Sequence, residues 1–269
     1  MLAAALVHAT WNAILRARGD RLASITVMSL TSGVVGAIGA IALPVPLRPS
    51  WPFIAASAML QVIYCLALVR AYRDGLLAEA YPVARGASPL LVTIGALILA
   101  HERLSLASLV GVALVAAGIF GIALGGRRIA PRSIVAALIA GVMIASYTLC
   151  DGLGGRRSGD ALAYAAWLFA LQGAAMVIAF LAVRRAWPRL AFDADTGQSL
   201  LAGVLSLIAY GVVIWALSLA PMGQVSALRE TGILFAMIIG VAFLNERPRP
   251  VQAFSGLAIA LGAALLSGV

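Results

Sequence analysis

The stretch EAYPVARGASP, residues 79–89, places an arginine inside an apolar segment that runs on to the charged triplet HER. A related stretch, SALRETG at residues 226–232, opens a second apolar segment that ends in the triplet NER. A shift of 144 positions aligns Arg85 with Arg229. The chain therefore contains an internal duplication, and each copy keeps an arginine well inside a hydrophobic segment.

The composition is that of a membrane protein. Of 269 residues, 63% are hydrophobic and only 11% are charged, and the mean hydropathy is +1.04. Roughly a quarter of the residues of an ordinary soluble domain are charged. Apolar runs of about 20 residues recur along the chain, and runs of that length predict membrane-spanning helices. The short alternating strands of a membrane barrel are absent from the sequence.

Charged residues, prolines and glycines divide the chain into ten expected spans. Their approximate residue ranges are 2–15, 22–43, 51–69, 76–100, 104–124, 131–150, 161–183, 198–220, 221–244 and 250–267. We therefore predict an all-α integral membrane protein with ten transmembrane helices. The first run covers only about 21 Å at about 1.5 Å per residue, less than the roughly 30 Å hydrocarbon core, so we expect the natural start to lie further upstream.

The duplication divides these spans into two five-helix repeats, residues 1–126 and 131–269. Because five is an odd number, the second repeat must enter the membrane from the opposite face. Two similar units in opposite orientation form an inverted repeat, which is typical of secondary transporters. The sequence thus favours transport by alternating access between two inverted halves.

Arginines between the spans predict an orientation. One face would carry Arg16, Arg18, Arg21, Arg70, Arg73, Arg127, Arg128, Arg132, Arg184, Arg185, Arg189, Arg247 and Arg249, and the other Arg48, Arg103, Arg156 and Arg157. The positive-inside rule puts the richer face in the cytoplasm and both termini outside. We expect a multi-pass protein of the cell inner (plasma) membrane.

Other classes of function find little support in the sequence. The net charge of +9 comes from arginines in short loops, so we expect no nucleic-acid partner. Cys65 and Cys150 lie in apolar runs and resemble buried small hydrophobes. The sequence has no Gly-x-Ser-x-Gly, no Cys/His cluster and no phosphate loop. We therefore expect no enzyme activity, no metal and no cofactor.

Arg85 and Arg229 are expected about half-way through the bilayer. An arginine there costs about 2.5–3.5 kcal/mol on insertion scales and needs a cavity, an acid or a ligand. Glu230 should point about 100° away from Arg229, which leaves cross-copy pairs of Arg85 with Glu230 or Arg229 with Glu79. Two explanations stay open: the arginines hold an anionic group of a substrate, or they form structural pairs that fasten the halves.

Further residues could complete such a site. The candidate substrate-binding residues are Trp11, Asn12, Tyr64, Tyr81, Arg85, Tyr147, Tyr210, Trp215, Arg229 and Glu230. The candidate proton carriers are Glu79, Glu230 and His8, and the candidate hinges are Pro82, Pro89 and Pro221. Each has an ordinary alternative: aromatic residues also form interface belts, and proline is common in transmembrane helices.

Several motifs together resemble a known family. Residues 78–120 contain Tyr-Pro-Val, His-Glu-Arg-Leu and Gly-Val-Ala-Leu-Val-Ala-Ala-Gly, and residues 216–266 repeat this cadence. HATWN at residues 8–12 and ASYT at residues 145–148 are similar to a first-helix signature in each half. The whole chain resembles an EamA-type ten-helix transporter of the drug/metabolite transporter superfamily. Family members often have an apolar residue where this chain has Arg85 or Arg229.

The resemblance implies export or exchange of a small metabolite, such as an amino acid, through a central cavity. It also implies cytoplasmic termini, the reverse of the orientation that the arginines predict. We therefore expect a secondary active transporter whose partners are a small-molecule substrate and the lipid bilayer, working as a monomer or homodimer. A membrane-embedded enzyme for a lipid-linked substrate and a non-transporting scaffold are the alternatives.

Overall fold

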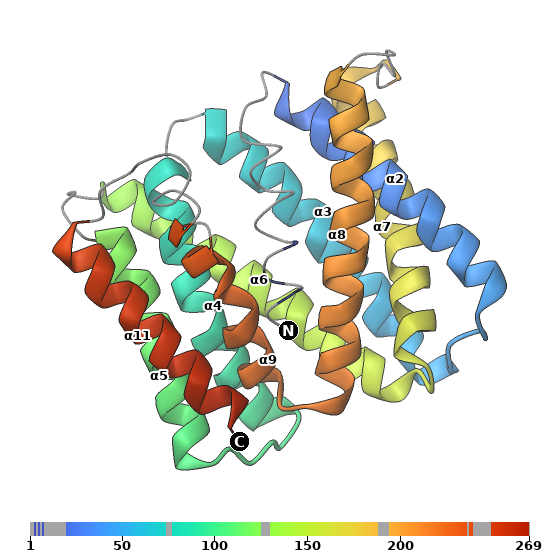
Figure 1. The fold of residues 1–269 in the computed structure, drawn as a ribbon. Helices are drawn as coiled ribbons and strands as arrows, with labels where there is room; N and C mark the ends of the chain where they lie inside the picture. The colour runs from blue at the N-terminus through green and yellow to red at the C-terminus, as the bar shows by residue number, and fades with distance from the viewer. Residues whose placement is uncertain are drawn as a thin grey trace. The chain divides into compact units, whose positions relative to one another are not determined.

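Helices make up every described element of the fold (Figure 1). The computed structural model describes residues 3, 5, 7, 20–73, 77–124, 130–187, 194–235, 237–238 and 249–268, without the side chains of 71–73, 77–81, 124 and 194–195. The helices are α2 (Arg21–Ala42), η1 (Arg48–Ser50), α3 (Trp51–Arg73), α4 (Leu77–Leu99), α5 (Leu106–Leu124), α6 (Pro131–Arg157), α7 (Ala161–Arg184), α8 (Ala194–Leu219), α9 (Met222–Glu230) and α11 (Pro250–Ser267).

The long helices have the composition of membrane spans. Within the described ranges, 8 helices are long and apolar enough to cross a bilayer. Large apolar side chains lie on their outer surfaces, among them Ile38, Ile41 and Phe254 at 62%, 88% and 73% exposed. Such surfaces are stable against lipid but not against water. The chain is therefore a multi-pass, all-helical membrane protein, as the sequence predicts, while the tenfold count and the inverted arrangement stay predictions.

Several helix boundaries differ from the expected ones: helix α3, for example, ends at Arg73 instead of near Val69. Helix α6 continues to Arg157 instead of ending at Cys150, because Gly154 packs against the side chains of Phe53 and Tyr164 and does not break the helix. Helix α8 begins at Ala194, within what the sequence suggested was a loop.

The helices gather into two compact units. The first contains α4, α5, α9, α11 and α6 as far as Leu149, and the second contains α2, α7, α8, α3 as far as Val69 and the rest of α6. Each unit draws helices from both predicted repeats. The 144-residue shift carries α5 onto residues 250–268, almost the range of α11, so equivalent helices of the two copies belong to the same unit.

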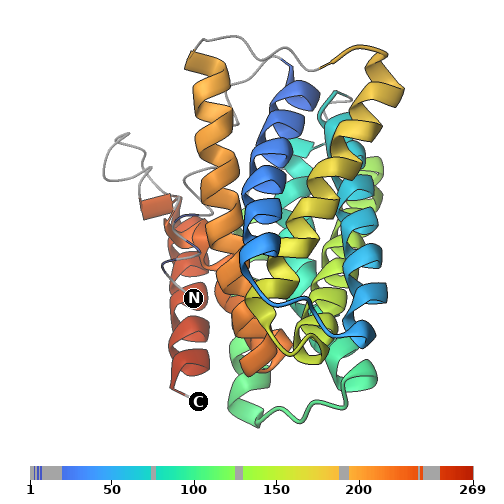
Figure 2. The same cartoon turned by 90° about the vertical axis from the view of Figure 1, so that its right-hand side faces the viewer.

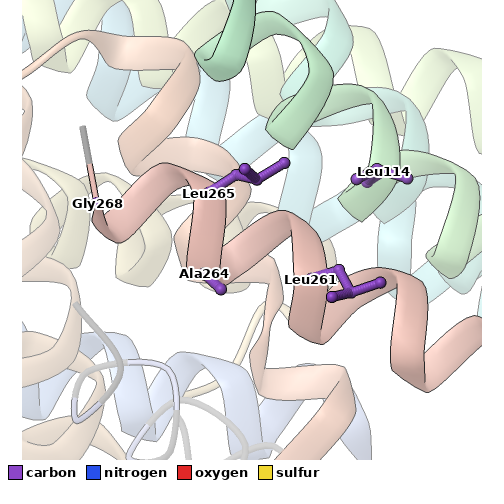
Figure 3. Close-up of a pocket in the computed structure, with 5 residues that line it drawn as sticks. All are labelled: Leu114, Leu261, Ala264, Leu265 and Gly268. Carbon is purple, nitrogen blue, oxygen red and sulfur yellow. The ribbon is translucent and has the colours of Figure 1, made fainter.

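Close helix packing within each unit depends on glycine. In the second unit α2 and α7 lie side by side (Figure 2), and a Cβ atom at Gly36 would stand 2.8 Å from the carbonyl oxygen of Ala166. In the first unit α5 and α11 contact each other along their length, and a shallow groove on this pair is lined by apolar residues alone (Figure 3). Its lining residues are Leu114, Leu261, Ala264, Leu265 and Gly268. The described lining is almost entirely apolar, so the groove suits lipid better than a polar solute.

Candidate functional site

The helix that follows Pro221 is interrupted after Glu230, within the first unit. Helix α9 starts directly after Pro221 and ends at Glu230, and Thr231 forms a turn before helical residues resume at 232–235. The Thr231 hydroxyl donates to the carbonyl oxygen of Leu228 at 2.7 Å, and its own carbonyl accepts from the amide of Leu234 at 2.9 Å. Such tight mid-helix turns often mark functional hinges. The residues at the break are Arg229 and Glu230.

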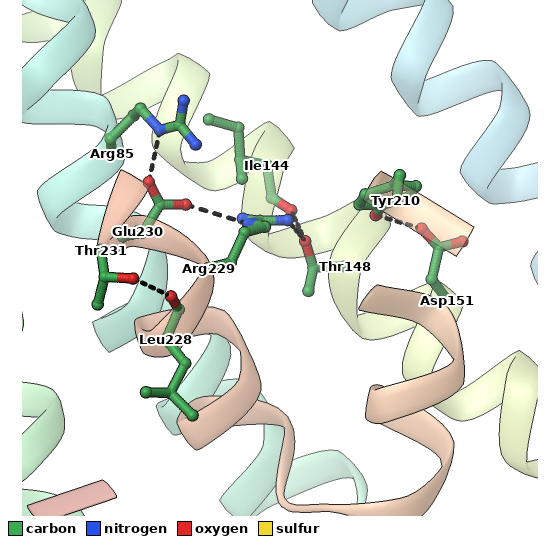
Figure 4. A network of polar contacts seen from close by, with 9 residues as sticks. All are labelled: Arg85, Ile144, Thr148, Asp151, Tyr210, Leu228, Arg229, Glu230 and Thr231. Carbon is green, nitrogen blue, oxygen red and sulfur yellow. Dashed lines mark hydrogen bonds and ion pairs between the residues drawn. The ribbon is translucent and has the colours of Figure 1, made fainter. Parts of the chain in front are cut away.

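Glu230 lies between two arginines (Figure 4). Arg85 Nε on α4 donates to Glu230 Oε2, and Arg229 Nε donates to Glu230 Oε1 at 3.1 Å. All three side chains are buried, with 11%, 5% and 1% of the Arg85, Arg229 and Glu230 side chains exposed. The Arg85–Glu230 pair is one of the two cross-copy pairs that the sequence suggested. We refer to these residues as the Arg85–Glu230–Arg229 triad.

The contact between Arg229 and Glu230 corrects one expectation from the sequence. Adjacent residues on a regular helix point about 100° apart. Here the helix ends at Glu230, and the long arginine side chain turns back to the neighbouring carboxylate. Arg229 Nη1 also reaches the hydroxyl of Thr148 on α6, at 3.5 Å, and this hydroxyl donates to the carbonyl oxygen of Ile144 at 2.7 Å.

Two serine hydroxyls flank the triad without partners of their own. Ser88 follows Arg85 by three residues on α4, and Ser226 precedes Arg229 by three residues on α9, so each shares a helix face with its arginine. Both serines are 0% exposed, and within the described part of the chain neither hydroxyl has a hydrogen-bond partner. Buried polar groups are normally satisfied. The two hydroxyls are therefore candidates for contact with a bound solute.

Helices α4 and α9 approach each other closely at this site. A Cβ atom at Gly223 would stand 2.2 Å from the hydroxyl oxygen of Thr93, so only glycine fits there. Helix α4 remains helical through Pro82 and Pro89, and Pro221 lies just before α9. The role of these prolines as hinges stays a prediction.

A second acidic group lies in the second unit. Asp151 on α6 is 0% exposed. Its Oδ2 accepts a hydrogen bond from Tyr210 on α8 at 2.6 Å, and its Oδ1 accepts from Tyr164 on α7 at 3.2 Å. Tyr210 was expected to bind substrate directly, whereas Asp151 was expected in a loop. The sequence reasoning missed Asp151 because three nearby glycines suggested a helix end.

The other predicted site residues are spread more widely. Tyr64 and Tyr147 are partly buried, and Trp215 is 50% exposed. His8, Trp11 and Asn12 lie outside the described residues, as do the side chains of Glu79 and Tyr81. Among the described residues no cluster of three His, Cys, Asp or Glu could hold a metal ion.

Comparisons with known proteins agree with this architecture. A family model described as "EamA-like transporter family" matches residues 131–268. A solved structure titled "Crystal structure of protein" superposes with a TM-score of 0.77 at 19% sequence identity, covering 98% of this chain and 92% of the other. At that identity the likeness shows the fold alone. No curated protein sequence matches the chain. The match over residues 131–268 covers just over half of the chain, which therefore belongs to the EamA-like transporter family.

Proposed function

We propose that this membrane transporter of small solutes is a secondary active transporter for a solute with an anionic group, such as an amino acid or a related carboxylate. The observation that carries the proposal is the buried Glu230 held between Arg85 and Arg229 at the break in the ninth span. Broken helices at such depth are where secondary transporters bind their substrates.

Charge favours an anionic solute. The triad holds two guanidinium groups and one carboxylate, a formal sum of +1, and all three side chains are buried. A charge inside a membrane span is costly and usually functional. Guanidinium groups bind carboxylates through forked hydrogen bonds, so a carboxylate on the solute suits a site with two arginines.

The serine hydroxyls supply uncharged contacts at the same place. Ser88 and Ser226 are buried on the two helices that carry the arginines. A hydroxyl both donates and accepts hydrogen bonds. Each can therefore bind a second polar group of the solute, and we include both serines with the two arginines in the proposed site.

The arrangement of the helices supports alternating access. Each compact unit combines equivalent helices of the two sequence copies, as α5 and α11 illustrate. Two inverted repeats interlocked in this way can present a site to each side of the membrane in turn. We propose ten transmembrane helices in two inverted repeats, located in the cell inner membrane.

The solute class is tested with purified protein in detergent and in proteoliposomes. Thermal shift across amino acids, organic acids and amines identifies binding solutes, and uptake of the radiolabelled solutes follows. Anionic solutes and amino acids should give the largest shifts. Arg229→Lys should weaken both binding and uptake because it keeps the charge but loses the fork. The control Arg132→Gln changes an exposed arginine of the same unit.

The serines provide a sharper test, because stability and binding should change in opposite directions. Removal of an unsatisfied buried hydroxyl recovers up to about 1–3 kcal/mol of desolvation cost. Ser88→Ala and Ser226→Ala should therefore be at least as stable as the wild type yet bind the solute more weakly. Shifts given by amines alone, or full transport by Arg229→Lys and both serine variants, would overturn the proposed site.

A further inference from the structure

Asp151 is a second ionisable group inside a membrane span, and the proposed function gives it no role. Helix α6 has 27 residues, Pro131–Arg157, and so is about 40 Å long at about 1.5 Å per residue. If the roughly 30 Å hydrocarbon core is centred on this helix, Asp151 lies about one turn inside its boundary. It is 0% exposed. An ionisable residue at such a depth is functional by default.

Two tyrosines hold the Asp151 carboxylate, one at each oxygen. The Tyr210 hydroxyl donates to Oδ2 at 2.6 Å, as Figure 4 shows, and the Tyr164 hydroxyl donates to Oδ1 at 3.2 Å. The two donors come from different helices, α8 and α7. A phenol can also accept a hydrogen bond. If Asp151 takes up a proton, its new hydroxyl can donate to a tyrosine oxygen, so the cluster stays hydrogen-bonded in both charge states.

The Glu230 carboxylate has hydrogen-bond partners of the opposite kind. Its two oxygens accept from guanidinium groups, which donate hydrogen bonds but cannot accept them. A proton on Glu230 would therefore remove the negative charge between two arginines, and its hydroxyl would face donors. Glu230, which the sequence suggested as a proton carrier, thus has two described partners that could not accept a hydrogen bond from a protonated carboxyl group. The two tyrosine contacts of Asp151, by contrast, are compatible with either charge state of its carboxyl group.

The described titratable side chains near Asp151 lie on three helices, α6, α7 and α8. They include Tyr164 from α7, Tyr210 from α8 and the neighbouring Cys150 from α6 itself. Arginines later in α6 are engaged with other groups: Arg156 Nε donates to the carbonyl oxygen of Leu217 at 3.1 Å, and the Arg157 guanidinium lies 4.9 Å from the Phe53 ring centre.

We propose that Asp151 binds and releases the proton that drives transport, with Tyr164 and Tyr210 as positioning residues that hold both of its charge states. The step is a simple equilibrium in which one proton from water joins a carboxylate oxygen of Asp151 and later leaves it. No electron is transferred and no other bond breaks. The proposal rests on the proposed transport function, and it adds the ion that supplies the energy.

Infrared difference spectroscopy tests proton binding without a known solute. Purified protein in lipid vesicles is taken from neutral to acidic pH, and the carbonyl band of a newly protonated buried acid is recorded. The band should be present in the wild type and missing in Asp151→Asn. Asp160→Asn is the matched control: Asp160 caps α7 through the amides of Leu162 and Ala163, and asparagine caps helices equally well. This control should retain the band.

A tyrosine variant distinguishes proton binding from a purely structural network. Tyr210→Phe removes one hydrogen bond to the Asp151 carboxyl group and should move the band to higher frequency without abolishing it. A wild-type spectrum that lacks the band, or an Asp151→Asn spectrum that retains it, would overturn the proposal. This variant also keeps the test decisive if Asp151→Asn fails to fold, because an unmoved band would then assign the proton to another acid.

Transport measurements separate coupling from solute movement. Proteoliposomes loaded with an unlabelled mixture of the common amino acids are placed in the same mixture carrying a radiolabel. Asp151→Asn should still exchange label but lose accumulation driven by an imposed pH gradient, whereas Asp160→Asn should do both. A wild type that does not exchange counts against the proposed solute class, and the infrared result still decides the proton site. Undiminished pH-driven accumulation by Asp151→Asn overturns the coupling role.

Discussion

Glu230→Gln should destabilise the protein more than Arg229→Gln, although both changes remove the same pair. Glutamine keeps the shape of glutamate, but its amide group presents donors to guanidinium groups that are themselves donors. Two buried arginines, Arg85 and Arg229, then lose the charge of the carboxylate between them. Breaking a buried pair by removing one partner costs about 3–5 kcal/mol. We expect Glu230→Gln to fall in this range.

Arg229→Gln instead leaves a charge-balanced pair of Arg85 and Glu230. Arg85 still donates to Glu230, so one positive and one negative charge remain together. The loss is that of one hydrogen bond to a charged acceptor, about 1.5–3 kcal/mol. In the double variant, removal of Arg229 also relieves the repulsion that Glu230→Gln creates. The double variant should therefore cost less than the sum of the single variants, by about 0.5–3 kcal/mol, the range measured for residues in one network.

The assay is reversible unfolding in mixed micelles of mild and denaturing detergent, followed by tryptophan fluorescence and helical circular dichroism. Arg132→Gln, at an exposed position, should change the free energy of unfolding by no more than about 0.5 kcal/mol. Equal costs for Glu230→Gln and Arg229→Gln, with strict additivity in the double variant, would refute the idea that one carboxylate is shared by two arginines.

Three further outcomes follow from the fold. Gly36→Ala should separate α2 from α7 and cost about 1–3 kcal/mol of unfolding free energy, whereas Gly211→Ala on α8, which meets nothing within 4 Å, should be neutral or stabilising in the same assay. The Glu102 carboxylate accepts a hydrogen bond at 3.0 Å from the first backbone amide of α9. Glu102→Ala should therefore lower the free energy of unfolding by about 1 kcal/mol and speed hydrogen exchange at that amide; unchanged exchange would contradict this cap. If the arginine count sets the orientation, single cysteines at positions 48 and 132 should react with impermeant thiol reagents from outside and inside the cell respectively; the opposite labelling would favour the cytoplasmic termini implied by the family.

The sequence predicts most helix boundaries well, because the charged residues, prolines and glycines that end a membrane helix are easy to recognise. Helix α11 begins at Pro250 and ends at Ser267, as expected, and α5 matches it after the 144-residue shift. The duplication also made a pair of Arg85 with Glu230 one of two expected possibilities. Hydropathy and internal repetition are properties of the amino-acid sequence itself, so the helices and the pairing of the two copies can be predicted from it.

What the sequence could not supply was the local geometry. The glycines after Asp151 resemble a helix end, yet Gly154 is the contact surface for Phe53 and Tyr164, and α6 continues. The contact of Arg229 with its neighbour depends on α9 ending at that residue. In the same way, only the structure shows that the Ser88 and Ser226 hydroxyls are buried without a partner among the described residues. A serine three residues from a midspan arginine is a weak signal, because serine is common in transmembrane helices.

The two buried acids differ in the one property that separates solute binding from energy coupling. A group that helps to hold the proposed anion site in order must keep its charge throughout the cycle, and the two described partners of Glu230 are guanidinium groups, which donate hydrogen bonds but do not accept them. A group that couples transport to protons must exist in two charge states at similar cost, and phenols on both oxygens of Asp151 meet that requirement. Exchanging the two environments should therefore exchange the two roles. Because Arg85→Tyr alone would leave the Arg229–Glu230 pair in place, both guanidinium groups must be replaced. The double variant Arg85→Tyr/Arg229→Tyr should let Glu230 take up a proton, which would appear as a second pH-dependent carbonyl band that Glu230→Gln abolishes. A spectrum without that second band would show that the type of hydrogen-bond donor does not decide which acid carries the proton.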